Sequence, residues 1–137
     1  MYFLDTCTCI EFLRGRLKIG YQHMRNGLPN DYQLPAIVAA ELWFGAEHSL
    51  NPSRECSIVE QFVGAFSIVP FDSDAAREYG RLRQLLGSQG QIIGDRDLMI
   101  AATTLAHDAT LVTNNVSEFV RVPNLKMESW VEVDLPN

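Results

Sequence analysis

The sequence predicts an α/β fold, in which short buried strands alternate with amphipathic helices. Residues 2–4 form an apolar run that ends abruptly at Asp5 and leads directly into a helical pattern, as at the start of a β-α-β unit. Residues 109–112 form a second apolar, β-leaning run. Between the two runs, apolar residues recur at helical spacing over residues 37–48 and 75–86. Strands that alternate with helices in this way indicate a parallel sheet covered by helices.

The first third of the chain predicts two strands and three helices. Residues 6–8 carry hydroxyl groups suited to cap a helix that closes at Gly15. A polar helix is expected within residues 20–30, broken by the sequence at 27–30, and residues 33–35 form a second short strand. The helix at 37–48 follows directly, so the second strand also leads into a helix.

The middle of the chain predicts two further helices around a strand. Residues 51–53 form a turn and cap before a helix at 55–66, and residues 67–71 form a strand that ends at a proline. Residues 72–74 then cap the helix at 75–86. The apolar residues expected to face inward from the helix at 55–66 are Ile58, Phe62, Ala65 and Phe66.

The last third predicts a helix, a strand, a short helical turn and an edge strand. After a loop at 87–90, the periodicity changes to helical with Asp95 as the expected N-cap. The strand at 109–112 ends in polar residues, and a short helical turn follows at 118–119. Residues 125–128 form the final edge strand.

The composition is typical of a globular protein. Of the 137 residues, 47% are hydrophobic, which is enough to bury a core without disulfides or a structural metal, so a single domain over residues 1–137 is expected. No apolar run approaches the ~20 residues that a membrane span needs. An acid stands near the N-terminus, where a secretory signal would carry basic residues. We therefore expect a cytoplasmic protein without a membrane partner.

Three cysteines, Cys7, Cys9 and Cys56, are an odd number for a chain without an export signal. A disulfide framework is therefore not expected. The three histidines are far apart, and no second Cys or His pair has the spacing of a zinc site. We interpret the cysteines as small buried hydrophobic residues.

The net charge of −6 argues against a protein that coats nucleic acid nonspecifically, but it does not exclude a nuclease. Basic residues cluster at Arg14, Arg16 and Lys18, and again at Arg81 and Arg83. Such clusters are more often solvated helix faces than binding surfaces.

Acidic and polar residues stand at positions that a parallel sheet would bring together. Asp5 and residues 113–115 follow two predicted strands, Asp97 lies in the first turn of a helix, and Glu41 lies beside an apolar helical stripe. Taken alone, Asp97 is also explained as one of the acidic residues that commonly occur in the first turn of a helix. Glu41 is likewise explained as a residue at the rim of a buried helix face.

Carboxylates forced together repel one another unless a cation neutralises them. With oxygen ligands and no Cys/His set, the expected cation is Mg²⁺, with Mn²⁺ as the other candidate. Such an ion polarises a phosphoryl oxygen and lowers the pKa of a bound water, so the implied chemistry is phosphodiester hydrolysis.

The residues of nearly the whole chain resemble the PIN-domain ribonucleases and, within them, the VapC toxins of bacterial and archaeal toxin–antitoxin pairs. Each matching segment is short, but their order and separation are specific. The matching segments are Leu4-Asp5-Thr6, Ala39-Ala40-Glu41-Leu42, Phe44-Gly45-Ala46, 79–83, Ile93-Gly94, 97–102, 109–115, Glu118-Phe119 and 122–125. The resemblance implies a three-layer α/β/α sandwich about a small, mostly parallel sheet, and a Mg²⁺-dependent endoribonuclease of a type II toxin–antitoxin pair.

The resemblance also assigns roles to individual residues. Asp5, Glu41 and Asp97 match the three invariant acids of the family. Asp5 and Asp97 are then the main metal ligands, and Glu41 completes the acidic pocket through the metal's water shell or orients the attacking water. Thr6 matches the hydroxyl beside the first acid, and Thr113 matches the hydroxyl that supports the site after the last strand.

Two positions depart from the family pattern. Cys7 stands where the family often has asparagine or serine, so a polar hydrogen bond near Asp5 is lost. Asn115 stands where many PIN domains carry a fourth acid, and Glu118 is the residue that can supply this charge from the next turn. A neutral fourth position holds a second metal weakly, so one well-occupied ion is expected.

The resemblance implies partners as well: a homodimer, a VapB-type antitoxin whose C-terminal segment covers the acidic groove, and larger toxin–antitoxin assemblies. Phe12 and Trp43 are candidates to anchor such a segment, and core packing explains them equally well. An arginine of the antitoxin would suit the acidic pocket.

Two other functions are compatible with parts of the pattern. A non-catalytic PIN-like module would bind metal and antitoxin without cleaving RNA, but a degenerate module is expected to lose one of the three acids. A phosphoacceptor domain would carry a lysine after its last strands, and no lysine occurs between Lys18 and Lys126.

Overall fold

The computed structural model describes residues 1–15, 22, 27 and 31–130, and all structural statements refer to these residues. Apart from residues 22 and 27, the polar helix predicted within 20–30 lies outside the described part of the chain, as do the basic residues Arg16 and Lys18, and so they stay predictions.

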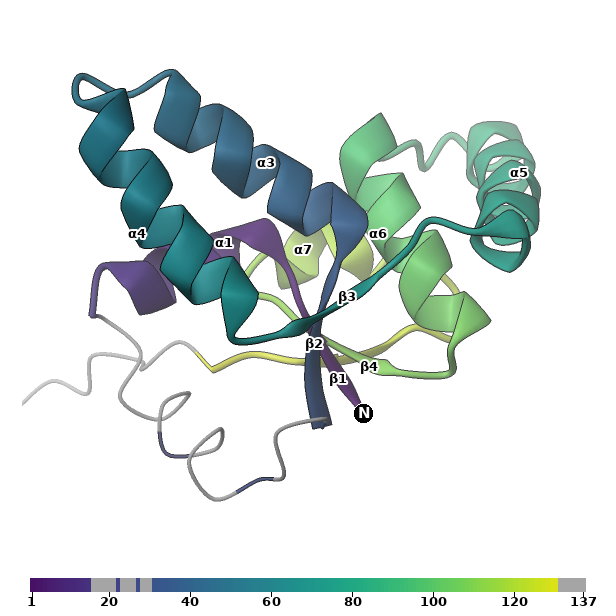
Figure 1. Cartoon of the computed structure of the whole chain (residues 1–137). Coiled ribbons are helices and arrows are strands. Elements are labelled where there is room, and N and C mark those ends of the chain that lie inside the picture. The colour runs from purple at the N-terminus through teal and green to yellow at the C-terminus, as the bar shows by residue number, and fades with distance from the viewer. Residues whose placement is uncertain (16–21, 23–26, 28–30, 131–137) are drawn as a thin grey trace, which may run out of the picture.

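A five-stranded, all-parallel sheet forms the centre of the fold (Figure 1). The strands are β1 (Tyr2–Leu4), β2 (Tyr32–Pro35), β3 (Ser67–Val69), β4 (Thr110–Val112) and β5 (Lys126–Glu128). Their order across the sheet is β3-β2-β1-β4-β5, so the chain runs to one edge and then returns past β1 to the other. The carboxyl ends of β1 and β4 therefore flank a topological switch point, where α/β proteins bind ligands.

Helices cover both faces of this sheet, as the sequence predicted. The described helices are α1 (Thr6–Leu13), α3 (Ala36–Glu47), α4 (Pro52–Gly64), α5 (Ser73–Ser88), α6 (Asp95–Ala106) and α7 (Val116–Phe119). In Figure 1, α1, α3 and α4 lie together on one side, and α5 and α6 lie on the other. The predicted α/β sandwich about a small parallel sheet is confirmed.

The central strands read as continuous apolar runs because helices bury them on both faces. Phe3 and Leu4 of β1, Leu34 of β2, and Leu111 and Val112 of β4 are fully buried. β5 is the exposed edge strand that the sequence predicted, and it runs parallel to β4.

The inward face of α4 differs in part from the prediction. The helix begins at Pro52 and ends at Gly64. Phe62 and Phe66 are partly buried against the core, as predicted, but the buried residue of the helix is Val59, whereas Ile58 and Ala65 are exposed. Two adjacent apolar residues allow either choice, and packing against α3 decides between them.

Two helix caps also differ from the prediction. Asp5 itself caps α1, because its carboxylate accepts a hydrogen bond from the backbone N–H of Thr8, so the hydroxyls of residues 6–8 are not the caps. α6 begins at Asp95, and its N-cap is Gly94 rather than Asp95. The caps predicted before α4 and α5 are confirmed, because Asn51 and Asp72 accept bonds from the first turns of these helices.

The cysteines are free thiols, but only one is the small buried residue that the sequence predicted. Cys9 is fully buried, Cys56 is partly buried and Cys7 is exposed. Cys7 is exposed because it lies in the first turn of α1, at the edge of the sheet where the polar residues gather.

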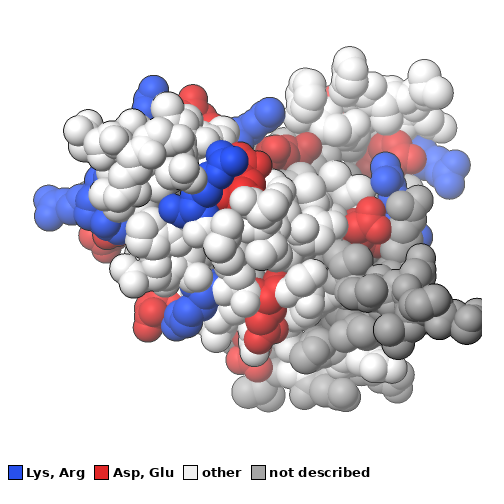
Figure 2. Space-filling model, turned by 180° about the vertical axis from the view of Figure 1, so that it is seen from behind, with Lys and Arg blue, Asp and Glu red and all other residues white. Residues whose placement is uncertain are grey.

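Charge is distributed without a continuous basic surface on the face that Figure 2 draws. Lysine, arginine, aspartate and glutamate side chains of the described residues are interspersed there among uncharged ones (Figure 2). No described helix is long and apolar enough to cross a membrane.

Candidate active site

Asp5 is a buried carboxylate at the carboxyl end of β1, with only 3% of its surface exposed. One oxygen, Oδ1, accepts a hydrogen bond from the Thr8 backbone N–H at 2.8 Å. The other, Oδ2, accepts a hydrogen bond from the Thr113 hydroxyl. Burial raises the pKa of Asp5, and these hydrogen bonds act in the opposite direction. The two donors thus hold this carboxylate in one orientation.

Thr113 connects the ends of β4 and β1. Its fully buried hydroxyl donates to Asp5 and accepts a 2.9 Å bond from the backbone N–H of Asn115. Thr8 makes a second link, because its hydroxyl donates to the carbonyl of Val112 at 3.0 Å. Side chains that are far apart in sequence therefore join the two strands at the switch point.

Glu41 reaches the same place from the middle of α3. Its Oε1 accepts a 2.8 Å hydrogen bond from the Thr6 hydroxyl of α1, and its Oε2 lies 3.7 Å from Nε of Arg96 in α6. The side chain is 22% exposed. Glu41 is therefore turned toward the carboxyl edge of the sheet rather than toward open solvent.

Asp97 lies half-buried in the first turn of α6, next to the other acids. Its pKa is raised to about 6. Burial contributes most to the rise, followed by the charges of Glu118, Glu41 and Asp5. The guanidinium of Arg96 acts in the opposite direction. The four carboxylates are thus close enough to repel one another.

Two hydrogen bonds tie Glu118 of α7 to the site. Its Oε2 accepts a 2.9 Å bond from the side-chain amide of Asn115, and its Oε1 accepts a 3.2 Å bond from the backbone N–H of Gly94. These two bonds lower the pKa of Glu118, with smaller contributions from the charge of Arg121 and from Asp97. The fourth negative charge at the site belongs to Glu118, and the neutral Asn115 orients it.

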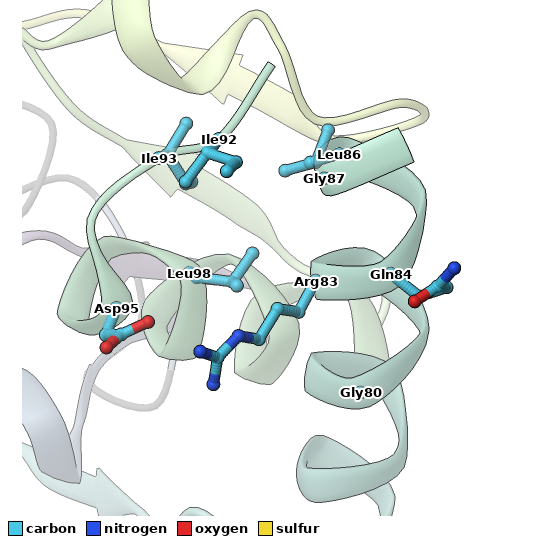
Figure 3. Close-up of a pocket in the computed structure, with 9 residues that line it drawn as sticks. All are labelled: Gly80, Arg83, Gln84, Leu86, Gly87, Ile92, Ile93, Asp95 and Leu98. Atoms are coloured by element: carbon cyan, nitrogen blue, oxygen red, sulfur yellow. The ribbon is translucent and has the colours of Figure 1, made fainter. Parts of the chain in front are cut away.

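Asp95 belongs to different surroundings, although it is only two residues from Asp97. The hydroxyl of Tyr79 donates a 3.2 Å hydrogen bond to Asp95 and accepts one from Arg83 at 3.1 Å. Figure 3 shows Asp95 at one end of a pocket of about 390 Å³ between α5 and α6, with Arg83 reaching into it and Leu98 on its apolar wall. The first turn of α6 thus presents two acids in two directions.

Cys7 lies beside the acidic cluster. Partial desolvation raises the pKa of its thiol although the residue is exposed, and the charges of Asp5, Asp97 and Glu41 raise it further. The thiol therefore stays protonated at neutral pH.

The structure places all seven candidate site residues at one edge of the sheet: Asp5, Thr6, Glu41, Asp97, Thr113, Asn115 and Glu118. Two members of this network, Thr8 and Arg96, were not predicted from the sequence. Both had a local signal, because Thr8 is the third residue after a helix-capping acid and Arg96 adjoins Asp97 in the same helical turn.

The donor set suits a hard divalent cation, because it consists of carboxylate and hydroxyl oxygens. Among the described residues, no three His, Cys, Asp or Glu side chains already stand together as a complete metal site. The carboxylates of Asp5 and Asp97 are oxygen donors of the kind that would hold such an ion. The mutual repulsion that raises the pKa of Asp97 is what a bound cation would relieve.

Comparison with known proteins agrees with this arrangement. Residues 2–125 match the model of the PIN domain family. This chain belongs to the PIN-domain family. Its relatives within the family are VapC ribonucleases, and the matched residues include all four acids of the site.

Two relatives and one solved structure illustrate the similarity. "Ribonuclease VapC2" of Rickettsia felis is 36% identical over 131 residues, which cover 95% of this chain and 98% of the relative. "tRNA(fMet)-specific endonuclease VapC" of Salmonella typhimurium is 33% identical over 136 residues, covering 94% and 97%. A chain of the crystal structure of DNA-bound VapBC from Salmonella typhimurium superimposes with a TM-score of 0.90 at 32% identity, over 94% of this chain and 97% of that one.

Proposed function

We propose that this chain is a Mg²⁺-dependent endoribonuclease, the VapC-type toxin of a type II toxin–antitoxin pair. The observation that carries the proposal is the convergence of Asp5, Glu41, Asp97 and Glu118 at the switch point of a PIN-domain sheet. Relatives that match nearly end to end are named ribonucleases. The alternative is a non-catalytic PIN-like module, in which the same acids bind metal without RNA cleavage.

Asp5 and Asp97 would hold the Mg²⁺ ion, and Mn²⁺ would fit the same oxygen donors. When bound, the ion would stabilise the negative charge that develops on the phosphoryl oxygens during hydrolysis. The Thr113 hydroxyl and the Thr8 backbone N–H would keep Asp5 deprotonated and hold its carboxylate in one orientation, because each donates a hydrogen bond to one of its oxygens. Their bonds act against the desolvation that raises the pKa of Asp5.

Glu41 would orient the attacking water. Thr6 donates to one oxygen of Glu41, and the other oxygen lies 3.7 Å from Nε of Arg96 at the edge of the site. A carboxylate held in this way can accept a proton from water as the oxygen attacks phosphorus. Glu118 would complete the negative pocket, held in place by Asn115 and Gly94.

A groove that adjoins the site suits an antitoxin segment. It has a volume of about 400 Å³ and lies between α1, α3 and α4. Ile10, Leu13 and Ile58 line it with apolar surface, and its charged residues are Arg14, Arg54, Glu41 and Glu55. A peptide with apolar side chains matches the apolar part of this groove, and an arginine of that peptide would pair with Glu41 at the end nearest the site. Solved structures of similar chains are titled as VapBC complexes, which supports a VapB-type partner here.

Phe12 and Trp43, for which antitoxin anchoring and core packing were both left open, are partly buried. Phe12 lies against Phe62 at a ring distance of 6.0 Å, and Trp43 packs against the core. Among the described residues, the exposed large aromatic side chain is Phe44, which stacks on His48 at the C-terminal part of α3. Core packing thus accounts for Trp43, and an anchoring role for either residue stays a prediction. The homodimer implied by the family stays a proposal, to be tested by light scattering.

The deciding experiment is cleavage of RNA by the purified chain, with Mg²⁺ and with EDTA. Total small RNA and initiator tRNA are the substrates to test, the latter because one relative is named a tRNA(fMet)-specific endonuclease. Asp5→Asn removes the buried acid, and Asp108→Asn is its matched control. The side chain of Asp108 is 93% exposed and pairs with Lys126, near the amino ends of β4 and β5.

Discrete fragments that vanish with EDTA and with Asp5→Asn, but persist with Asp108→Asn, are the expected result. Intact RNA in every reaction, from a folded chain that still binds Mg²⁺, would favour the binding module. Circular dichroism and a thermal melt of both variants exclude misfolding as the cause.

A further inference from the structure

Arg96 is the one residue of α6 that places a positive charge on the acidic site. It directly precedes Asp97 in the first helical turn, and its Nε lies 3.7 Å from Oε2 of Glu41. It is also the group whose charge lowers the pKa of Asp97 against the effect of the surrounding acids. Arg96 therefore neutralises part of the charge for which a metal ion would otherwise be needed.

The contact between Arg96 and Glu41 is loose. At 3.7 Å it is an ion pair rather than a hydrogen bond, and 70% of the arginine side chain is exposed. The other oxygen of Glu41 is held by Thr6 at 2.8 Å. Glu41 is thus anchored on one side, while its cationic partner on the other side is free to leave.

We propose that Arg96 is an exchangeable counter-ion of the site: it pairs with Glu41 in the metal-free protein and, once the cation is bound, turns to a phosphate of the RNA. The proposal rests on the function proposed above. It makes Arg96 a competitor of the metal for Glu41 and, at the same time, a substrate-binding residue.

Charge is the first argument for a phosphate as the second partner. RNA must approach four carboxylates on a protein of net charge −6. Once a cation held by Asp5 and Asp97 neutralises the acidic cluster, the attraction between Glu41 and the guanidinium at the rim weakens, while the nearest incoming anion is the RNA backbone. A guanidinium can donate two parallel hydrogen bonds to a phosphate, whereas the ammonium of a lysine acts as a point charge.

Position is the second argument. Arg96 stands at the amino end of α6, where the helix dipole also favours an anion. Its long side chain can swing away from Glu41 without disturbing the core, because most of that side chain is exposed.

The exchange predicts opposite effects on metal and on RNA from one substitution. Arg96→Gln removes the competing cation, so Mg²⁺ is expected to bind about two- to fivefold more tightly, the size of one exposed ion pair. The same change removes a phosphate contact, so KM for the RNA is expected to rise about tenfold. Arg96→Lys keeps the charge and is expected to recover part of the loss in KM.

Mg²⁺ binding is measured by calorimetry without RNA, and KM and kcat are measured separately with a defined RNA. Arg81→Gln is the matched control, because Arg81 is likewise an exposed arginine paired with a glutamate, Glu78, but lies on α5. It is expected to change neither quantity. In Arg96→Gln, the slope of log RNA affinity against log salt is expected to become shallower by about 0.7, the value for one phosphate contact on a single strand.

Unchanged or weaker Mg²⁺ binding in Arg96→Gln would overturn the exchange at Glu41. An unchanged KM and salt slope would overturn the phosphate contact. A wild-type chain that cleaves no RNA would refute the proposed function and the phosphate contact together, while the calorimetric titration would still test the competition for Glu41.

Discussion

The buried hydroxyl of Thr113 donates a hydrogen bond to Asp5, and this contact links the carboxyl ends of β4 and β1 at the centre of the acidic site. The same hydroxyl accepts the backbone N–H of Asn115. A hydroxyl can donate and accept at once, so one threonine orients the acid and begins the turn that carries Glu118.

Thr113→Val, which keeps the shape but removes the hydroxyl, is expected to lower both stability and cleavage. The buried carboxylate of Asp5 loses a hydrogen-bond donor, and the backbone N–H of Asn115 loses its acceptor. The free energy of unfolding is expected to fall by about 1–3 kcal/mol. The control is Thr103→Val, because the buried hydroxyl of Thr103 donates only to a carbonyl of its own helix, that of Met99. Urea unfolding and RNA cleavage measure the two effects. Equal losses in both variants would show that the Thr113 contact has no special role.

Asp97→Asn is expected to stabilise the metal-free chain at neutral pH. The folded-state pKa of about 6 lies above the ordinary value of 3.8, so the folded protein holds a proton that the unfolded chain has released between these values. The resulting loss of stability grows as pH rises from about 4 to 6 and is complete above 6. Thermal melts at a pH of about 7.5, well above the folded-state pKa, should therefore show a higher Tm for Asp97→Asn, with the gain shrinking toward pH ~4.

Asp95→Asn serves as the control for that measurement. It removes the same charge from the same helical turn, but Asp95 accepts a hydrogen bond from Tyr79 and faces the pocket between α5 and α6. No pH-dependent gain is expected from it. A gain of similar size in both variants would show that the net charge of the helix start, and not the acidic cluster, is responsible.

Mg²⁺ binding is expected to weaken as pH falls through about 6. A metal ligand must be deprotonated, and Asp97 takes up its proton in this range in the metal-free site. Among the neighbouring charges, that of Glu118 raises the pKa of Asp97 most, so Glu118→Gln should shift the loss of Mg²⁺ binding to lower pH. Calorimetric titrations of both proteins across this pH range test the shift. If Mg²⁺ binding is lost at the same pH in both, the role given to Glu118 is contradicted.

Asn115→Asp is expected to destabilise the metal-free chain and to increase its stabilisation by Mg²⁺. The substitution replaces the amide that donates to Glu118 with a further carboxylate. A cation relieves this repulsion, so the rise in Tm on adding Mg²⁺ should exceed that of the wild type. The adjacent exposed residue provides the control, because Asn114→Asp adds the same charge outside this bond. Equal shifts in Tm for the two variants would argue against a metal near Asn115.

Much of the fold was predictable because its signals are local. The runs at β1 and β4 end at polar residues, and the helices show their period in the spacing of apolar side chains. The parallel order then follows from the alternation of strand and helix. The choice between adjacent residues was not predictable in the same way: Val59 rather than Ile58 faces the core, since the pattern in α4 permits both.

The site shows the same difference between what the sequence predicts and what only side-chain packing decides. Asp5, Glu41 and Asp97 could be selected from the sequence, because each is an acid beside an apolar pattern in an order that resembles the family. The partners that set their chemistry could not. The Asp5 cap on α1, the pair between Glu41 and Arg96, and the bond from Asn115 to Glu118 depend on side-chain directions.

The sequence by itself determined the elements, their parallel arrangement and the identity of the acids, because backbone periodicity and chain order are local properties. Only the tertiary structure decided which acids share one electrostatic environment. Asp95 and Asp97 lie in the same turn of α6, yet one faces Tyr79 and the other faces Glu41 and Glu118. Neighbours on a helix point in different directions, and only the packing of α6 between α5 and the sheet assigns each acid its surroundings.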